Sequence, residues 1–434
     1  MLLPRWLALV LLTSCVSCSR SAPRSQAAVA APASSAVPPA ASASATGAPR
    51  KAGPPTFEGP SNVVQSMALT DAGQVRFVNA ASLVEWTPAT SAMTKRPIPF
   101  DTLYTAASKA PAKVTFGKEG ELLLPPMAAP ASCIAKADCK RNAEATEAEV
   151  SFEFSDDGQR VLFAACEFAV YPALCALSVF DFASGAVVAK LFSGGWTGGV
   201  ARHLAPKGDY AILVGVGRTE IVSLASQKIV FSAAYTINDF PRFRFVDEHT
   251  VLFSAAGELK VVELTTGKLV RRKVLADDTT LELGPDGRRV LLTGTGFAVW
   301  SATTGVTVNA VKGPPRCADC KGEWTSDRHV RFSGLGAGRP DVLFDAVTKT
   351  QSESAPPDEA VFAADGFTVT RNLWDGSLRV TTPTGKRAPL EATKDAPRFF
   401  VAGGRLFAQC WAWADIIEAD GTGHSFPRTV FQAH

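Results

Sequence analysis

The feature that most constrains the fold is a short phrase that recurs along most of this 434-residue chain. Each copy has an apolar run, a turn and a second apolar run, as in LELGPDGRRVLL at 281–292. Asp-Gly and other glycine-rich turns supply the positive φ that tight hairpins require. Nine copies align at their turns, 38 to 50 residues apart: Gly73, Gly120, Gly158, Gly208, His249, Gly287, Arg328, Gly366 and Gly404. A period near forty residues indicates a repeat architecture.

A second phrase follows the first by 17 to 20 residues in seven of the nine units. It is LKVVELTTGKLV at 259–270, and its turn recurs at Thr304-Gly305 and Thr384-Gly385. Each unit therefore predicts four short antiparallel strands in a meander. No long apolar stripe with a period of 3.6 residues follows residue 61, so we expect no helices in the repeats.

A four-stranded sheet of this size cannot bury both faces alone, so such units stack radially and cover one another. The phrases S/P-D-G-x-x-h and h-x-V-W/F-D/S-x-x-T/S-G resemble those of the WD40 and YVTN-type propeller superfamily over residues 61–430. The Trp-Asp dipeptide of strict WD40 repeats is only hinted at, by Val299-Trp300 and Phe180-Asp181, and the Gly-His pair is absent. Trp86 and Trp300 lie within third strands, where we expect core residues.

The blade number depends on the second unit, which loses its third and fourth strands after ELLLPP at 121–126. Eight complete units remain. We therefore predict an all-β propeller of eight four-stranded antiparallel blades, with seven blades as the alternative.

The N-terminus, MLLPRWLALVLLTSC, has Arg5 and then an apolar run at 6–12 that is too short to span a bilayer. The residues Leu12, Thr13, Ser14 and Cys15 resemble the bacterial lipobox, in which the cysteine is lipidated. The alternative is an ordinary signal peptide with an incidental cysteine.

This resemblance predicts three segments. Residues 1–14 are a lipoprotein signal peptide, residues 15–60 are the lipidated Cys15 and a disordered tether rich in Ala, Ser and Pro, and residues 61–434 are the propeller. The expected location is the bacterial cell envelope, where the lipid anchors the protein at the periplasmic face of the outer membrane or at the cell surface.

Composition and motifs exclude several other function classes. The 44 basic and 41 acidic residues give a net charge of +3, which provides no single-sign field for nucleic acid. The five histidines occur singly and no G-x-S-x-G elbow is present. We therefore predict no metal, no cofactor and no catalytic residue.

Seven cysteines lie beyond the lipobox, and disulfides are the default in an exported protein. Cys166 and Cys175 bracket an expanded loop between a second and a third strand, where they would face one another. Cys133 with Cys139, and Cys317 with Cys320, each precede the first strand of a unit and are expected to form local bridges. A redox pair at Cys317 and Cys320, or a zinc site formed by both pairs, is a minor alternative. Cys410 is expected to be a buried small apolar residue.

These cysteine loops belong to two loop classes, from fourth to first strand and from second to third strand, that share one rim of such a propeller. Five aromatic residues fall in the same classes: Tyr171, Trp196, Trp374, Trp411 and Trp413. A rim of bridged loops with aromatic residues is typical of a recognition surface. The alternative is that these rings pack between blades.

Two functions are compatible with these features. The first is a non-catalytic scaffold, monomeric, that binds a protein or a glycan at the rim; an accessory lipoprotein of outer-membrane protein assembly is one specific version. The second is a propeller enzyme, a quinoprotein-like dehydrogenase or a glycan-active hydrolase, with its site in the central channel. An enzyme would need charged residues from first strands, and the segments MALT, FEFS, LELG and VFAA are mostly apolar, which favours the scaffold.

Overall fold

The structure is a computed structural model that describes most of the repeat region. The residues described are 64–70, 72–79, 81–108, 113–116, 122–125, 148–167, 173–196, 201–215, 218–234, 242–255, 257–311, 320–335, 340–390, 398–409 and 413–427. The predicted signal peptide, Cys15 and the tether lie outside them.

Eight antiparallel sheets form the described part of the chain, and each is built from strands that are consecutive in sequence. Blades 1 to 4 comprise β1 (Val64–Leu69), β2 (Val75–Asn79), β3 (Ser82–Thr87) and β4 (Ala92–Pro97); β7 (Ala148–Phe154), β8 (Arg160–Glu167), β9 (Ala173–Asp181) and β10 (Val187–Trp196); β11 (Ala201–Leu204), β12 (Tyr210–Gly215), β13 (Arg218–Ser223) and β14 (Lys228–Ala234); and β15 (Arg242–Asp247), β16 (Thr250–Ala255), β17 (Glu258–Glu263) and β18 (Leu269–Val274).

Blades 5 to 8 repeat the same order of four strands. They comprise β19 (Thr280–Leu283), β20 (Arg289–Thr293), β21 (Phe297–Ser301) and β22 (Thr307–Val311); β23 (Lys321–Trp324), β24 (His329–Ser333), β25 (Val342–Asp345) and β26 (Thr350–Ser352); β27 (Glu359–Ala364), β28 (Phe367–Arg371), β29 (Leu378–Thr381) and β30 (Arg387–Leu390); and β31 (Arg398–Ala402), β32 (Arg405–Gln409), β33 (Trp413–Glu418) and β34 (Gly423–Pro427).

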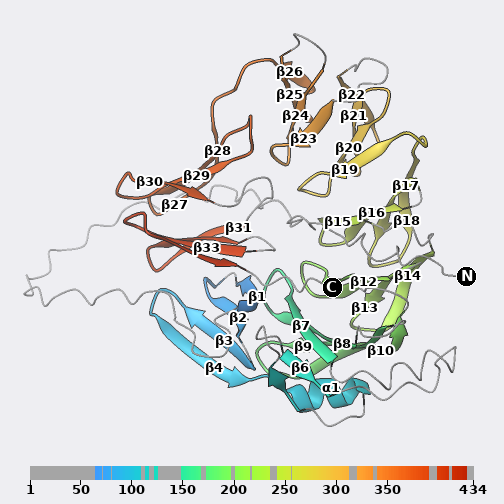
Figure 1. The fold of residues 1–434 in the computed structure, drawn as a ribbon, viewed down its shortest axis with the longest axis vertical. Coiled ribbons are helices and arrows are strands. Elements are labelled where there is room, and N and C mark those ends of the chain that lie inside the picture. Colours follow the sequence, from blue (N-terminus) through green and yellow to red (C-terminus); the bar gives the residue numbers. More distant parts are fainter. Residues whose placement is uncertain are drawn as a thin grey trace, which may run out of the picture.

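The sheets are arranged around a common centre, with the first strand of each blade toward the middle and the fourth toward the outside (Figure 1). The eight-bladed propeller predicted from the repeats, and its resemblance to WD40-type propellers at the level of fold, are thereby confirmed. The alternative of seven blades is wrong.

The core consists of apolar side chains packed between neighbouring blades. Trp324 joins a cluster with residues of blade 5, and Trp300 joins one with residues of blade 4. The ring closes in the same way, because Trp86 of blade 1 packs edge-on against Phe407 of blade 8 with ring centroids 6.0 Å apart. The prediction that Trp86 and Trp300 are core residues is confirmed. Within the described residues no strand is shared between the first and last blades, so closure depends on side-chain packing.

An arginine–carboxylate pair recurs at one position of the blades, where the second strand faces the third. Arg76 and Glu85 lie 2.8 Å apart, and Arg405 and Glu418 lie 2.7 Å apart, in each case as direct partners in the strand register. Arg76 also donates to the carbonyl oxygen of Gly158 in the next blade, at 3.0 Å. These arginines therefore satisfy buried polar groups at the junctions between blades.

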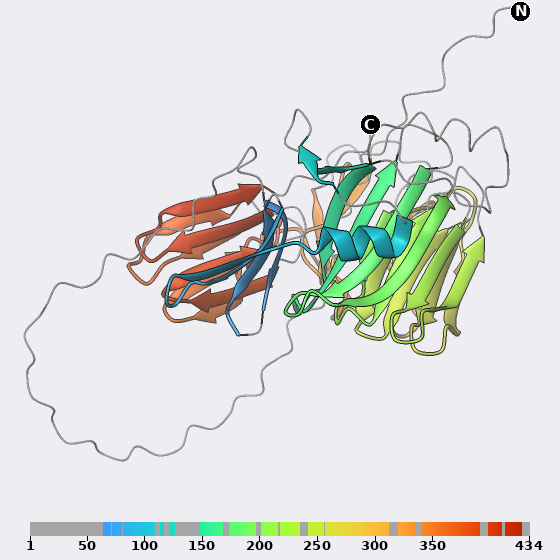
Figure 2. The same ribbon diagram turned by 90° about the horizontal axis from the view of Figure 1, so that it is seen from below.

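The expectation that the repeat region contains no helix is wrong in one place. Helix α1, Phe100–Ser108, connects blade 1 to the following strands and lies against β9 and β10 (Figure 2). Phe100, Leu103 and Tyr104 are buried on one side of it, at helical spacing. The helix is too short for its apolar stripe to stand out from the strand pattern in the sequence.

The incomplete second unit does not form a blade of its own. Its two strands, β5 (Thr115–Phe116) and β6 (Leu122–Leu124), extend blade 2 to six strands, because β6 pairs with β7 through Leu124 and Ala148. The remnant hairpin thus covers the inner edge of β7, which would otherwise be unpaired.

Candidate functional site

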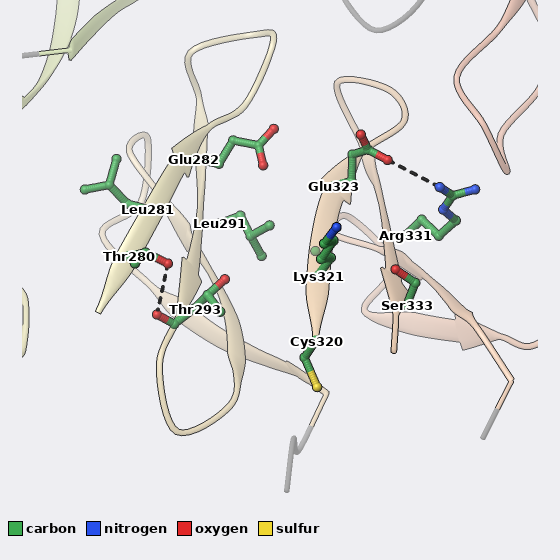
Figure 3. Close-up of a pocket in the computed structure, with 11 residues that line it drawn as sticks. Thr280, Leu281, Glu282, Leu291, Thr293, Cys320, Lys321, Glu323, Arg331 and Ser333 are labelled. Atoms are coloured by element: carbon green, nitrogen blue, oxygen red, sulfur yellow. Dashed lines mark hydrogen bonds and ion pairs between the residues drawn. The ribbon is translucent and has the colours of Figure 1, made fainter. Parts of the chain in front are cut away.

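A polar cavity of about 640 Å³ lies between blades 5 and 6. The first two strands of each blade line it: β19 and β20 from blade 5, β23 and β24 from blade 6 (Figure 3). The cavity extends to the strand ends at Thr280, Thr293, Cys320 and Ser333, where fourth-to-first and second-to-third connections meet. It therefore opens at the rim that the sequence predicts to be the recognition surface.

The wall from blade 5 carries one carboxylate, from Glu282, two hydroxyl groups, from Thr280 and Thr293, and the apolar side chain of Leu291. Thr280 pairs with Thr293 and Glu282 pairs with Leu291 in the register of β19 and β20, so these four side chains share one face of the sheet. The Thr280 hydroxyl donates to the Thr293 carbonyl oxygen at 3.5 Å (Figure 3). Glu282 is exposed to solvent at the cavity.

The wall from blade 6 carries both signs of charge. Lys321 is exposed, and Glu323 lies 3.3 Å from Arg331, its partner across the β23–β24 ladder (Figure 3). Both members of this ion pair are partly exposed, so water screens it and it adds little to stability.

The pKa of Asp375 in blade 7 lies below its usual value. Burial is the largest single influence and acts to raise this pKa, but hydrogen bonds from Ser377 and the positive charge of Arg331 contribute to the net lowering.

Gly322 lines this cavity at a point where the packing is tight. A Cβ atom at Gly322 would lie 2.8 Å from Leu291 Cδ2 and 2.9 Å from the Phe332 ring. A larger residue at this position would therefore require the side chains of Leu291 and Phe332 to move. Trp324 follows two positions later and is buried. Its indole N–H donates to the Glu282 carbonyl oxygen at 3.4 Å, and this hydrogen bond fixes the backbone that carries the Glu282 side chain.

Three of the six cysteines predicted to form disulfides fall within the described residues, and all three are at the rim. Cys166 and Cys175 are bonded, with Cα atoms 4.1 Å apart, and they face one another across β8 and β9 as predicted. Cys320, at the cavity mouth, is also disulfide-bonded. Its predicted partner Cys317, the pair Cys133 and Cys139, and Cys410 lie outside the described residues.

The serine variant Cys166→Ser is expected to lower the free energy of unfolding by about 2–3 kcal/mol, since the bridge closes a short loop. The melting temperature of the variant and of the wild type should be measured without reductant. Equal melting temperatures would show that the bridge contributes nothing. Cys320→Ser serves as a second variant, because Cys320 is bonded on another blade.

Of the five predicted rim aromatics, Trp196, Trp374 and Trp413 fall within the described residues, and only the Trp374 side chain has a described environment. Trp374 is half-buried in the turn between β28 and β29, where its backbone N–H donates to Asn372 Oδ1 at 2.9 Å. Trp196 ends β10 and Trp413 begins β33, so both are strand-end rather than loop residues. Tyr171 and Trp411 lie outside the described residues. A binding role for these five aromatics stays a prediction.

The first strands named above are mostly apolar, but some first strands also carry charged residues. In LELG the leucines pack toward blade 4, while Glu282 between them faces the cavity. In β11, burial lowers the pKa of Arg202 to about 10, against the opposing effects of Glu153 and Glu149 in β7. The neighbouring His203 Nδ1 lies 3.2 Å from Glu153 Oε2. A single charged residue in an apolar first strand can therefore line the cavity, and alternation along the strand is the signal that identifies it.

Two further features are absent from the described residues. No helix in this part of the chain is both long and apolar enough to cross a bilayer. Within the same residues, no three His, Cys, Asp or Glu side chains group as metal ligands would.

Comparisons with known proteins give fold-level likenesses of low similarity. No protein-family model and no curated protein sequence matches the chain. BamB from Moraxella catarrhalis aligns over 83% of this chain and 95% of its own, at 14% identity and a TM-score of 0.36. The C-terminal WD40 domain of Sif2 aligns over 84% of this chain and 95% of its own, at 10% identity and a TM-score of 0.37. The dihydro-heme d1 dehydrogenase NirN aligns over 74% of this chain and 75% of its own, at 14% identity and a TM-score of 0.36.

Proposed function

We propose that this protein is an exported, lipid-anchored scaffold that binds a protein or glycan of the bacterial cell envelope without transforming it. Its binding site is the cavity between blades 5 and 6 together with the rim around it. A partner that takes part in envelope assembly would suit this location. The resemblance of Leu12 to Cys15 to a lipobox supports export, and so does the disulfide between Cys166 and Cys175, because disulfides persist in oxidising compartments.

The observation that carries the proposal is the cavity itself. Its volume of about 640 Å³ is within the range of ligand sites, and exposed Glu282 and Lys321 line it beside hydroxyl groups. Convergent charged and hydroxyl groups of this kind fit a polar ligand, a peptide segment or a sugar. The disulfide at Cys320 fixes the strand at the mouth, so less conformational entropy is lost when a ligand binds.

Photo-crosslinking in cells tests this proposal directly. A benzophenone amino acid at Thr293, at the cavity mouth, should crosslink to one abundant envelope component, and the same group at Val347, exposed on blade 6 away from the cavity, should not. The substitution Glu282→Lys should abolish the crosslink at Thr293 while the melting temperature stays the same. Equal crosslinking at both positions, or no effect of Glu282→Lys, would overturn the proposal.

A second candidate, glycan hydrolysis, is favoured by one observation: Glu282 and Glu323 line the same cavity. Most glycosidases use two carboxylates flanking the scissile bond. Release of soluble fragments from envelope glycans by the purified protein, lost in both Glu282→Gln and Glu323→Gln, would support this enzyme. If the wild-type protein releases no soluble fragments, glycan hydrolysis is contradicted and the scaffold function remains.

The lipid anchor is tested separately. We expect Cys15→Ala to move the protein from the membrane fraction to the soluble fraction of the envelope, because the lipidated residue is lost. The measurement is immunoblotting after fractionation, with Cys18→Ala as the matched control because Cys18 also lies near the predicted cleavage site. Membrane retention of Cys15→Ala would contradict a lipid anchor at this residue.

A further inference from the structure

An apolar surface outside the cavity lies along the outer strands of blades 3 and 4. Leu269 and Val270 of β18 are 48% and 49% exposed, Val274 of the same strand is 66% exposed, and Ile229 of β14 is 55% exposed. We call these four residues the outer apolar row. Large aliphatic groups this exposed are few in the described residues, and singly they need no explanation, but four on two adjacent strands do.

The turn that precedes β18 reaches β14 of the neighbouring blade. A Cβ atom at Gly267, in the turn that leads into β18, would overlap the carbonyl oxygen of Val230 in β14. On the other side, Lys273 Nζ donates to Thr307 Oγ1 of blade 5 at 3.1 Å. Figure 1 shows β14 and β18 side by side at the outer margin of the ring.

Strand β18 is also the last strand of its sheet. One side of its backbone pairs with β17, and the N–H and C=O groups on the other side have no strand of this sheet to pair with. Edge strands normally discourage additional strands through charges or bulges. β18 has both, since it carries three cations at 271–273 and a register shift against β17, so this edge suits only a strand of complementary charge. The geometry is that of a site for strand addition, in which backbone hydrogen bonds give affinity and alternate side chains give specificity.

The charge of this edge selects the partner. From Glu258 to Val274 the chain has five cations and two carboxylates. One of the carboxylates, Glu258, is already paired with both Arg272 and Lys260, and their hydrogen bonds lower its pKa. Arg271 and Lys273 therefore leave a net positive field along β18. A basic strand would be repelled there.

We infer that the outer edge of β18, with the outer apolar row, binds an extended segment of a partner protein in which acidic and aliphatic side chains alternate. The segment pairs with β18 as a fifth strand of blade 4, its aliphatic side chains lie on Val270 and Val274, and its carboxylates face Arg271 and Lys273. This site is separate from the cavity between blades 5 and 6, and the inference does not rest on the function proposed above.

The probe is a fluorescein-labelled peptide of six alternating valine and glutamate residues, the length of β18. It should bind the full propeller in fluorescence anisotropy, and the same peptide with lysine in place of glutamate should bind at least about tenfold more weakly. N-methylation of alternate amides, on the side that faces β18, should abolish binding because the backbone hydrogen bonds are lost. This last comparison leaves the protein unchanged, so it does not depend on whether a variant folds.

On the protein, Val274→Glu should weaken binding of the acidic peptide at least about tenfold, because it removes apolar contact and adds a like charge. Val347→Glu is the matched control, since Val347 is 51% exposed but lies on blade 6. Sedimentation velocity of the wild-type protein completes the test. Failure of the acidic peptide to bind, equal binding of the lysine peptide, an equal effect of Val347→Glu, or a dimer of the propeller that Val274→Glu dissociates would each overturn the inference.

Discussion

Replacing Trp324 by alanine is expected to lower the free energy of unfolding by about 3–5 kcal/mol. Trp324 is 2% exposed and packs between blades 5 and 6, in a cluster that includes Leu291 and Phe332. Removing the indole leaves a cavity at the junction and frees the Glu282 carbonyl oxygen from its hydrogen bond. Urea unfolding followed by tryptophan fluorescence, with circular dichroism as a second probe, measures the effect.

The same substitution at Trp374 is the control. Trp374 is half-buried at the rim, so Trp374→Ala should lower the free energy of unfolding by less than about 1.5 kcal/mol. Trp324→Ala should also weaken any crosslink formed at Thr293, because the indole supports the strand that carries Glu282, whereas Trp374→Ala should leave it unchanged. Equal destabilisation by the two variants would contradict the packing described for the junction between blades 5 and 6.

The second large effect is expected at a turn. Gly287 has φ of +65°, and a Cβ atom there would overlap the carbonyl oxygen of Phe245 in the neighbouring blade. Gly287→Ala should therefore lower the free energy of unfolding by about 2–5 kcal/mol, of which the left-handed backbone accounts for about 1–2 kcal/mol and the overlap for the rest. Urea unfolding measures the change.

The matched control is a second glycine with the same backbone but with free space around it. Gly385 has φ of +79°, and nothing lies within 4 Å of a Cβ atom placed on it. Gly385→Ala should show only the backbone contribution of about 1–2 kcal/mol. If both variants lose the same free energy, the turn at Gly287 does not contact blade 4 as closely as the structure indicates.

These two glycines also explain why so much of the fold could be predicted from the sequence. A turn that needs positive φ restricts the residue type strongly, so Gly287 and Gly385 mark their hairpins whatever surrounds them. Apolar alternation then places the strands, and the stacking of small sheets follows from burial. The eight blades were predictable because each of these signals is local.

The candidate site was less predictable because it depends on how two blades face one another. Glu282 and Gly322 are 40 positions apart, and nothing near either residue indicates that a carboxylate will lie opposite a missing side chain. The strands of the β5–β6 hairpin were predicted, but their attachment to blade 2 was not, since it depends on the free edge of β7 and not on the residues of the hairpin. Which elements pair with one another depends on how well their surfaces fit together. No single position in the sequence specifies that fit.

The manner of ring closure has a consequence for how the chain reaches this structure. Each sheet consists of neighbouring segments, so nearly all pairing is of low contact order and can form as each segment emerges. The exception is the seam, where Arg398 donates to the Leu69 carbonyl oxygen, 329 positions away. A chain interrupted before residue 398 would hold seven formed sheets and present the aromatic face around Trp86 to solvent. The last blade therefore covers a surface that would otherwise be exposed. A circular permutant, in which the two ends of the chain are joined and a different rim connection is cut, should keep every sheet intact.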